Sequence, residues 1–253
     1  MSPLVESLIV FAAILGAALL GMWLGWVLPE HHLQNGTQTH IAAAVSVVGT
    51  LTALVLGLGI SNANTTRLAM VRDLALLSSN ILRTGELIRG YGPGAEDAHA
   101  MLARYAALKL EDLFPQVSGR EPNLSNPATD VLLDEVQGQL VNLHPQDDLQ
   151  RWRQAQALES TNQIVVQRWA IAEHVHATIP HSVVFVITFW LDILFCTYGL
   201  FMPRHLTAAT VILTSALAVA CAVFLILEAR SPFTGFVRID SGSLVEAVNL
   251  LRR

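Results

Sequence analysis

The sequence has little charge, and its charge is concentrated in the middle of the chain. Only 14% of its 253 residues are Asp, Glu, Lys or Arg, against about 25% in an ordinary soluble domain. About two thirds of them, 24 of 35, lie between Arg67 and Glu173. The net charge of −5 also argues against nucleic acid as a partner, because such proteins carry a basic patch or stripe. The chain therefore has to be interpreted segment by segment.

Cysteines and catalytic motifs are scarce as well. Cys196 and Cys221 both lie in apolar runs, which disfavours a disulfide, and no Cys/His spacing typical of a metal site is present. Nor is there a nucleophile motif, a phosphate loop or a paired-carboxylate pattern. We therefore expect no enzyme activity, no metal and no cofactor.

Histidines gather in two short stretches. These are His31, His32 and His40 in one stretch, and His174, His176 and His181 in the other. Helix ends at a membrane interface tolerate histidine without a special role. Metal binding and pH sensing remain open as minor alternatives.

Long apolar runs are what the sequence does have. They cover residues 4–28, 41–60, 181–202 and 206–227. About 20 apolar residues cross a hydrocarbon core, so each run predicts a membrane-spanning helix. The first lacks the basic start of a signal peptide and is expected to be retained. The prediction is an all-α membrane protein with a first hairpin (1–60), a cytoplasmic helical insert between the second and third spans (61–180), a second hairpin (181–228) and a tail (229–253).

Lysine and arginine predict the orientation. The segment 61–180 carries ten of them and the segment after residue 227 carries four, whereas the linker 29–40 has none and the turn 203–205 has one. Basic residues near span ends favour the cytoplasmic side. Both termini and the insert are therefore expected in the cytoplasm, in a bacterial inner membrane.

The insert has the pattern of a helical bundle. Apolar residues recur at three- and four-residue steps over 61–89, which predicts a helix continuous with the second span. Gly90 to Gly94 break it, and further helices are expected at 95–114, 128–143 and 147–179. In the tail, Val245, Val248 and Leu251 predict a short amphipathic helix that packs on the insert.

The second span carries a stripe of small and hydroxyl-bearing residues. Its members, at steps of four, three, four, four and three, are Ser46, Thr50, Ala53, Gly57, Ser61 and Asn64. Small residues let membrane helices pack closely, as we expect of Ala17, Gly21 and Gly25 in the first span. A small polar stripe can instead line a pore with hydrophobic constrictions beside it. Both interpretations remain open for the second span.

Two further acids accompany the spans. Asp192 lies near the middle of the third span, and Glu228 lies at the end of the fourth. Ionisable residues inside a membrane usually face the protein interior or water. Asp192 is expected to have a buried polar partner or a functional role, and Glu228 to act as an interfacial anchor or in a salt bridge with Arg230.

Four motifs resemble those of the prokaryotic bestrophin-like domain membrane proteins. They are Leu28 to His32, Thr52 to Leu58, Arg89 to Pro93, and Ser231 to Arg238. The resemblance implies a distant similarity to bestrophins, which are pentameric anion channels with four spans per subunit and a pore lined by the second span. The aromatic-rich neck and the acidic calcium clasp of bestrophins are absent, so anion selectivity and calcium gating are not implied.

Together these features predict a homo-oligomeric ion channel, a pentamer by resemblance alone, whose partners are membrane lipid and small inorganic ions. The predicted pore-lining residues are Ser46, Thr50, Leu54, Gly57, Leu58 and Ser61. Residues 61–180 hold 14 acids and ten bases, which mildly favours cations. The alternative is a non-conducting membrane-anchored scaffold or sensor, whose insert binds a partner protein.

Overall fold

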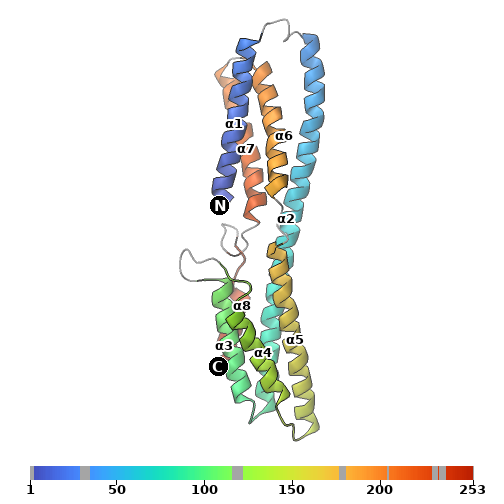
Figure 1. Cartoon of the computed structure of the whole chain (residues 1–253), viewed down its shortest axis with the longest axis vertical. Coiled ribbons are helices and arrows are strands. Elements are labelled where there is room, and N and C mark those ends of the chain that lie inside the picture. The colour runs from blue at the N-terminus through green and yellow to red at the C-terminus, as the bar shows by residue number, and fades with distance from the viewer. Residues whose placement is uncertain are drawn as a thin grey trace. The chain divides into compact units, whose positions relative to one another are not determined.

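The computed structural model describes residues 3–28, 35–115, 122–176, 181–203, 205–229, 233 and 238–252, and its regular elements there are all helices. These helices are α1 (Pro3–Val27), α2 (Asn35–Tyr91), α3 (Glu96–Leu113), α4 (Pro127–Val141), α5 (Asp148–His176), α6 (His181–Phe201), α7 (Leu206–Glu228) and α8 (Gly242–Leu251). They form two compact units. Unit 1 comprises residues 1–65 and 178–231, and unit 2 comprises residues 66–177 and 232–253. Figure 1 shows the helices of each unit running side by side.

Helices α1, α2, α6 and α7 are long and apolar enough to cross a membrane. This confirms the predicted set of apolar helices. Helix α2 is a single helix of 57 residues, which confirms that the second apolar run continues into the polar segment. It begins at Asn35, within the stretch that the sequence assigned to a linker; residues 29–34 lie outside the described part of the chain.

Close packing of α1 against α6 holds unit 1 together. A Cβ built on Gly21 would lie 1.9 Å from the carbonyl oxygen of Cys196, and one on Gly25 would lie 2.7 Å from that of Leu200. From the other side, a Cβ on Gly199 would lie 2.2 Å from the carbonyl oxygen of Ala18. Only glycine permits this approach, so the predicted packing role of Gly21 and Gly25 is confirmed.

The core of unit 2 is formed by the second half of α2 together with α3, α4, α5 and α8. Leu74, Leu77 and Ile81 of α2 are buried in it, as their spacing predicts. The predicted break after α2 is confirmed: Gly92 and Gly94 have φ angles of 94° and 100°, which favour glycine.

The C-terminal helix α8 packs on unit 2, as predicted. Its Leu244, Ala247, Val248 and Leu251 are buried. The prediction was wrong for Val245, which is exposed because it lies at the edge of the buried face, about 60° around the helix from Val248. Gly85 of α2 makes room for this contact, since a Cβ there would lie 2.1 Å from Cδ2 of Leu251.

Candidate functional site

Within unit 1, helix α2 has one packed face and one open face. Val45 and Thr52 are buried, and Val48, Val55 and Leu56 beside them are half-buried against the other spans. The hydroxyl of Thr52 donates to the Val48 carbonyl at 2.8 Å, so this polar group is satisfied within the helix. These residues define the packed face of α2.

All of the predicted pore-lining residues lie on the open face of α2. Each of them is exposed in the single chain: Ser46, Thr50, Leu54, Gly57, Leu58 and Ser61. At about 100° per residue, they occupy a sector of about 120° centred opposite the packed face. No other part of the described chain in unit 1 covers them.

The small residues of α2 divide between the two faces. A Cβ on Gly49 would lie 3.6 Å from a side-chain carbon of Leu194, so Gly49 packs against α6. A Cβ on Gly57 would meet nothing within 4 Å, and Ala53 is exposed. Close packing within the chain therefore accounts for Gly49 but not for Ala53 or Gly57.

Hydroxyl groups on the open face bond to the helix itself. Ser46 donates to the Ala43 carbonyl at 2.7 Å, and Thr50 donates to the Ser46 carbonyl at 2.9 Å. Such bonds lower the cost of placing a hydroxyl in an apolar medium. The oxygen of each hydroxyl keeps lone pairs that can accept a bond from water or coordinate a cation.

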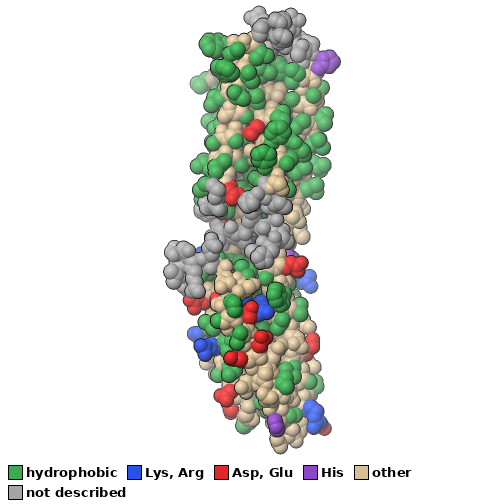
Figure 2. All heavy atoms as spheres, viewed as in Figure 1, with side chains coloured by type: hydrophobic (Ala, Val, Ile, Leu, Met, Phe, Trp, Pro, Cys, Tyr) green, Lys and Arg blue, Asp and Glu red, His purple; other side chains and the backbone are tan. Residues whose placement is uncertain are grey.

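The outer faces of α1 and α6 differ in chemistry from the open face of α2. Leu8, Leu19 and Trp26 of α1 and Phe185 and Phe189 of α6 are large, apolar and exposed. Figure 2 shows hydrophobic side chains over most of the visible surface of unit 1. Large apolar residues suit contact with lipid, whereas serine, threonine and glycine gain nothing from it. The open face of α2 therefore differs from the outer faces of α1 and α6.

A half-open cavity of about 460 Å³ lies between α2, α6 and α7. Its walls are mostly apolar, with Phe195, Met202 and Ile212 among them, and Ser46 lies at its edge. The cavity therefore adjoins the open face without forming a polar site.

The intramembrane acids differ in their surroundings. Asp192 is half-buried, and its Oδ1 is buried without a hydrogen-bond partner in the described part of the chain. It lies one turn before Cys196 on the side of α6 that contacts α1. Glu228 is buried, which differs from the expected interfacial anchor; its expected partner Arg230 lies outside the described residues.

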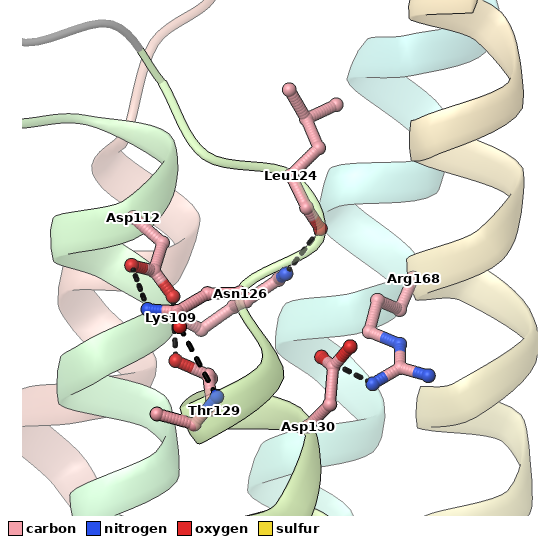
Figure 3. A network of polar contacts seen from close by, with 8 residues as sticks. Lys109, Asp112, Leu124, Asn126, Thr129, Asp130 and Arg168 are labelled. Atoms are coloured by element: carbon pink, nitrogen blue, oxygen red, sulfur yellow. Dashed lines mark hydrogen bonds and ion pairs between the residues drawn. The ribbon is translucent and has the colours of Figure 1, made fainter.

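A buried polar cluster in unit 2 was not anticipated from the sequence. Asp112 at the end of α3 accepts a bond of 2.6 Å from the Thr129 hydroxyl and one of 2.8 Å from Nδ2 of Asn126. Lys109 donates to the Leu124 carbonyl at 3.0 Å. Figure 3 shows these groups together with the ion pair between Arg168 of α5 and Asp130 of α4. The cluster therefore joins α3, α4 and the segment between them, with α5 held to α4 beside it.

Burial shifts the pKa of two groups near this cluster. It lowers the pKa of Lys109, against the opposing effect of Asp130 and Asp112. It raises the pKa of Tyr105, whose hydroxyl has no partner among the described residues. The hydrogen bonds of Asp112 and Lys109 and the Arg168–Asp130 ion pair hold neighbouring helices together, so the cluster fits a structural role.

The histidines do not form a metal site in the described part of the chain. His174 pairs with Asp73 across α5 and α2, with Nε2 3.1 Å from Oδ2. His31 and His32 lie outside the described residues, as do the side chains of His176 and His181. His40 is exposed.

Residues that sequence reasoning missed lie where spacing alone gives no signal. Gly199 is a lone glycine in α6, yet it contacts α1 as closely as the predicted Gly21 does. Lys109 and Asp112 share one side of α3 at a spacing of three residues, which also occurs on solvated helices. A lysine with Leu108, Leu110 and Leu113 around it is the one hint that this face is buried.

Comparison with known proteins agrees with this architecture. No curated protein and no solved structure matches the chain. The Bestrophin-like domain family model matches residues 12–244, which include α1 from residue 12 onward, the other three apolar helices and most of unit 2. With four apolar helices and a match over almost its full length, the chain is a multi-pass membrane protein that belongs to the bestrophin-like domain family.

Proposed function

We propose that this chain forms a homo-oligomeric ion channel in which the open face of α2 lines the pore. Ser46, Thr50, Gly57 and Ser61 would supply a narrow polar wall, and Leu54 and Leu58 would form a hydrophobic constriction that gates by dewetting. The pore would lie on the oligomer axis, because four spans in one small subunit leave no room for a pore inside it. A pentamer follows from family analogy alone.

One observation carries the proposal. The six residues predicted to line a pore lie together on the one face of α2 that the described part of unit 1 leaves open. A helix that simply packs inside its own subunit would bury its glycines, whereas Gly57 is open. The outer face of α1 carries leucine and tryptophan, whereas the open face of α2 carries Ser46, Thr50, Gly57 and Ser61 beside its leucines.

The orientation and the ion preference complete the proposal. Basic residues near the span ends support a position of both termini and of unit 2 in the cytoplasm of a bacterium, across its inner membrane. The surplus of acids in 61–180 favours cations at the inner mouth. The hydroxyl oxygens of α2 are compatible with cations because they can accept or coordinate as well as donate.

Flux through purified protein in liposomes tests the proposal, with potassium and chloride gradients imposed separately. We expect flux, with potassium faster than chloride. Leu54→Ser and Leu58→Ser should each raise it several-fold, because a polar side chain wets the constriction. The matched control is Leu19→Ser on α1, since Leu19 and Leu58 are equally exposed at 61% and 62%.

Two outcomes would overturn the proposal in different ways. Equal effects of Leu58→Ser and Leu19→Ser would mean that α2 does not line the pathway. No flux from well-folded oligomers would exclude a channel and favour the scaffold or sensor, with unit 2 as the surface that binds a partner protein.

A further inference from the structure

The outer side of α5 in unit 2 carries a stripe that no described part of the chain covers. Its members recur at alternating steps of three and four residues, and every one is exposed: Trp152, Ala155, Glu159, Asn162, Val166, Trp169 and Glu173. We name this set the α5 stripe. It lies opposite the buried face of α5, which includes Ala157, Ile164 and Ile171. Steps of this kind place residues on the seam of a helix–helix contact.

The composition of the α5 stripe is unusual for a surface in water. Trp152 and Trp169 are 55% and 61% exposed, and Val166 between them is 55% exposed. Tryptophan is enriched in the buried centres of protein interfaces, where it contributes most to affinity. Arg168 covers part of one tryptophan, with its guanidinium carbon 5.4 Å from the Trp169 ring centre, and the rest of that ring stays open. The stripe therefore has apolar anchors and two acids, Glu159 and Glu173.

A complementary stripe lies on α2 in the same unit. Its members recur at steps of four, three and four, and all of them are exposed: Arg72, Leu76, Ser79 and Arg83. We name this set the α2 flank. It offers two bases and a leucine, whereas the α5 stripe offers two acids and apolar rings. No acid in the described chain forms an ion pair with Arg72 or Arg83.

The two stripes also lie at matching positions along the helix axes of unit 2. Helices α2 and α5 run antiparallel, as His174 pairs with Asp73 and Gln156 accepts a bond of 2.9 Å from Arg83. Glu173 is therefore level with Arg72, and Glu159 is nearly level with Arg83. The acids are about 21 Å apart and the bases about 17 Å apart at 1.5 Å per residue. The flexible side chains of arginine and glutamate can span the difference.

From this complementarity we infer that the α5 stripe docks on the α2 flank of a second copy of this chain. In a ring with its axis along these helices, each copy sits at the same height as the next. Glu173 then meets Arg72 of the neighbour, Glu159 meets its Arg83, and Val166 and Trp169 cover its Leu76. The contact is heterologous, so it leaves a free stripe at each end until the ring closes. This inference rests on the homo-oligomer of the proposed function and names the surface that joins its subunits in unit 2.

Cross-linking between two differently tagged chains tests the contact. Both are expressed together without their native cysteines (Cys196→Ala and Cys221→Ala), one with Glu159→Cys and the other with Arg83→Cys, and treated with a short bismaleimide. Each chain then has a single thiol, so a product that carries both tags joins two copies. We expect this product for Glu159→Cys with Arg83→Cys, and for Glu173→Cys with Arg72→Cys. The matched control pairs Arg83→Cys with Glu135→Cys, an exposed acid on α4.

A second measurement uses charge. Glu159→Arg with Glu173→Arg should lower the oligomer fraction at least tenfold in mild detergent, and added Arg72→Glu with Arg83→Glu should restore it. Glu135→Arg should leave it unchanged.

The outcomes separate this contact from the channel. An intact oligomer without either cross-link would overturn the contact and leave the homo-oligomer standing. A monomer would remove the premise of both. Flux through the protein with both native cysteines replaced and no new cysteine, measured without cross-linker, reports on the channel alone.

Discussion

A series of glycine-to-alanine changes in α1 and α6 tests how closely the spans of unit 1 approach one another. The added methyl group would meet nothing within 4 Å at Gly16, the Leu200 carbonyl oxygen at 2.7 Å from Gly25, and the Cys196 carbonyl oxygen at 1.9 Å from Gly21. A comfortable carbon–oxygen contact needs about 3.4 Å. Gly21→Ala therefore forces α1 and α6 apart by about 1.5 Å, because a helix carbonyl cannot swing away as a side chain can.

The cost of this separation can be estimated. A gap of about 1 Å already removes about half of the dispersion attraction of the atoms that face it, and overpacked cores lose about 1–3 kcal/mol or more. We expect Gly21→Ala to cost about 3 kcal/mol and Gly25→Ala about 1 kcal/mol. Gly16→Ala should be neutral or stabilising by up to about 1 kcal/mol, since alanine is the better helix former.

Unfolding in a titration with SDS measures the series. Replacement of Trp152 and Trp169 by phenylalanine leaves three tryptophans, all in unit 1, as fluorescent reporters: Trp23, Trp26 and Trp190. Gly199→Ala is the reciprocal test, because its methyl would lie 2.2 Å from the Ala18 carbonyl oxygen. The double change Gly21→Ala with Gly199→Ala should cost less than the sum, since the first change has already separated the helices. Equal stability of Gly21→Ala and Gly16→Ala would refute the close approach.

Three further predictions concern unit 2. Asp112→Ala should destabilise it by about 2–5 kcal/mol, because the Thr129 hydroxyl and the Asn126 amide lose their shared acceptor; the exposed control Asp134→Ala should change the thermal midpoint little. Burial and the nearby Arg89 lower the pKa of His99, so the folded chain binds that proton more weakly than the unfolded chain does. Stability should therefore fall as pH drops below about 6.5, and less so in His99→Gln, which thermal melts from pH 7.5 to 5 would show or contradict. Gly85→Ala should cost about 1–2 kcal/mol by crowding Leu251, and a cost that persists in Leu251→Ala would mean that α8 does not pack there.

The sequence was sufficient for the helices because their signals are local. Apolar length marks the spans, and glycine and proline mark the break between α2 and α3. The face of α2 that is open in unit 1 could also be predicted, because its residues lie on a single helix and their spacing places them on one side of it. The short amphipathic pattern near the C-terminus predicted α8 for the same reason.

Contacts between distant segments were beyond such reasoning. Lys109, Asp112 and Thr129 look like surface residues until α3 and α4 are placed together, and then they are buried. In the same way, Leu68 and Val71 belong to the apolar repeat that predicted the helix over 61–89, yet both are exposed. Periodicity gives the direction of a side chain but not the presence of a neighbour on that side. Asp192 differs, because the sequence left open a buried polar partner or a functional role, and its buried Oδ1 has no partner among the described residues.

The open face of α2 and the α5 stripe lead to the same requirement by separate arguments. The first carries hydroxyls and a glycine where lipid would favour large apolar side chains, and the second carries two tryptophans where water would favour charge. Each is left open by the described part of a single chain; we propose a pore axis for the first and another copy of the chain for the second. Under the proposed contact, a ring that closes would cover every α5 stripe. The two proposals can therefore be refuted independently. A ring whose subunits contact one another elsewhere would conduct ions but give no cross-link at α5. A scaffold joined through α5 would give the cross-links but no ion flux.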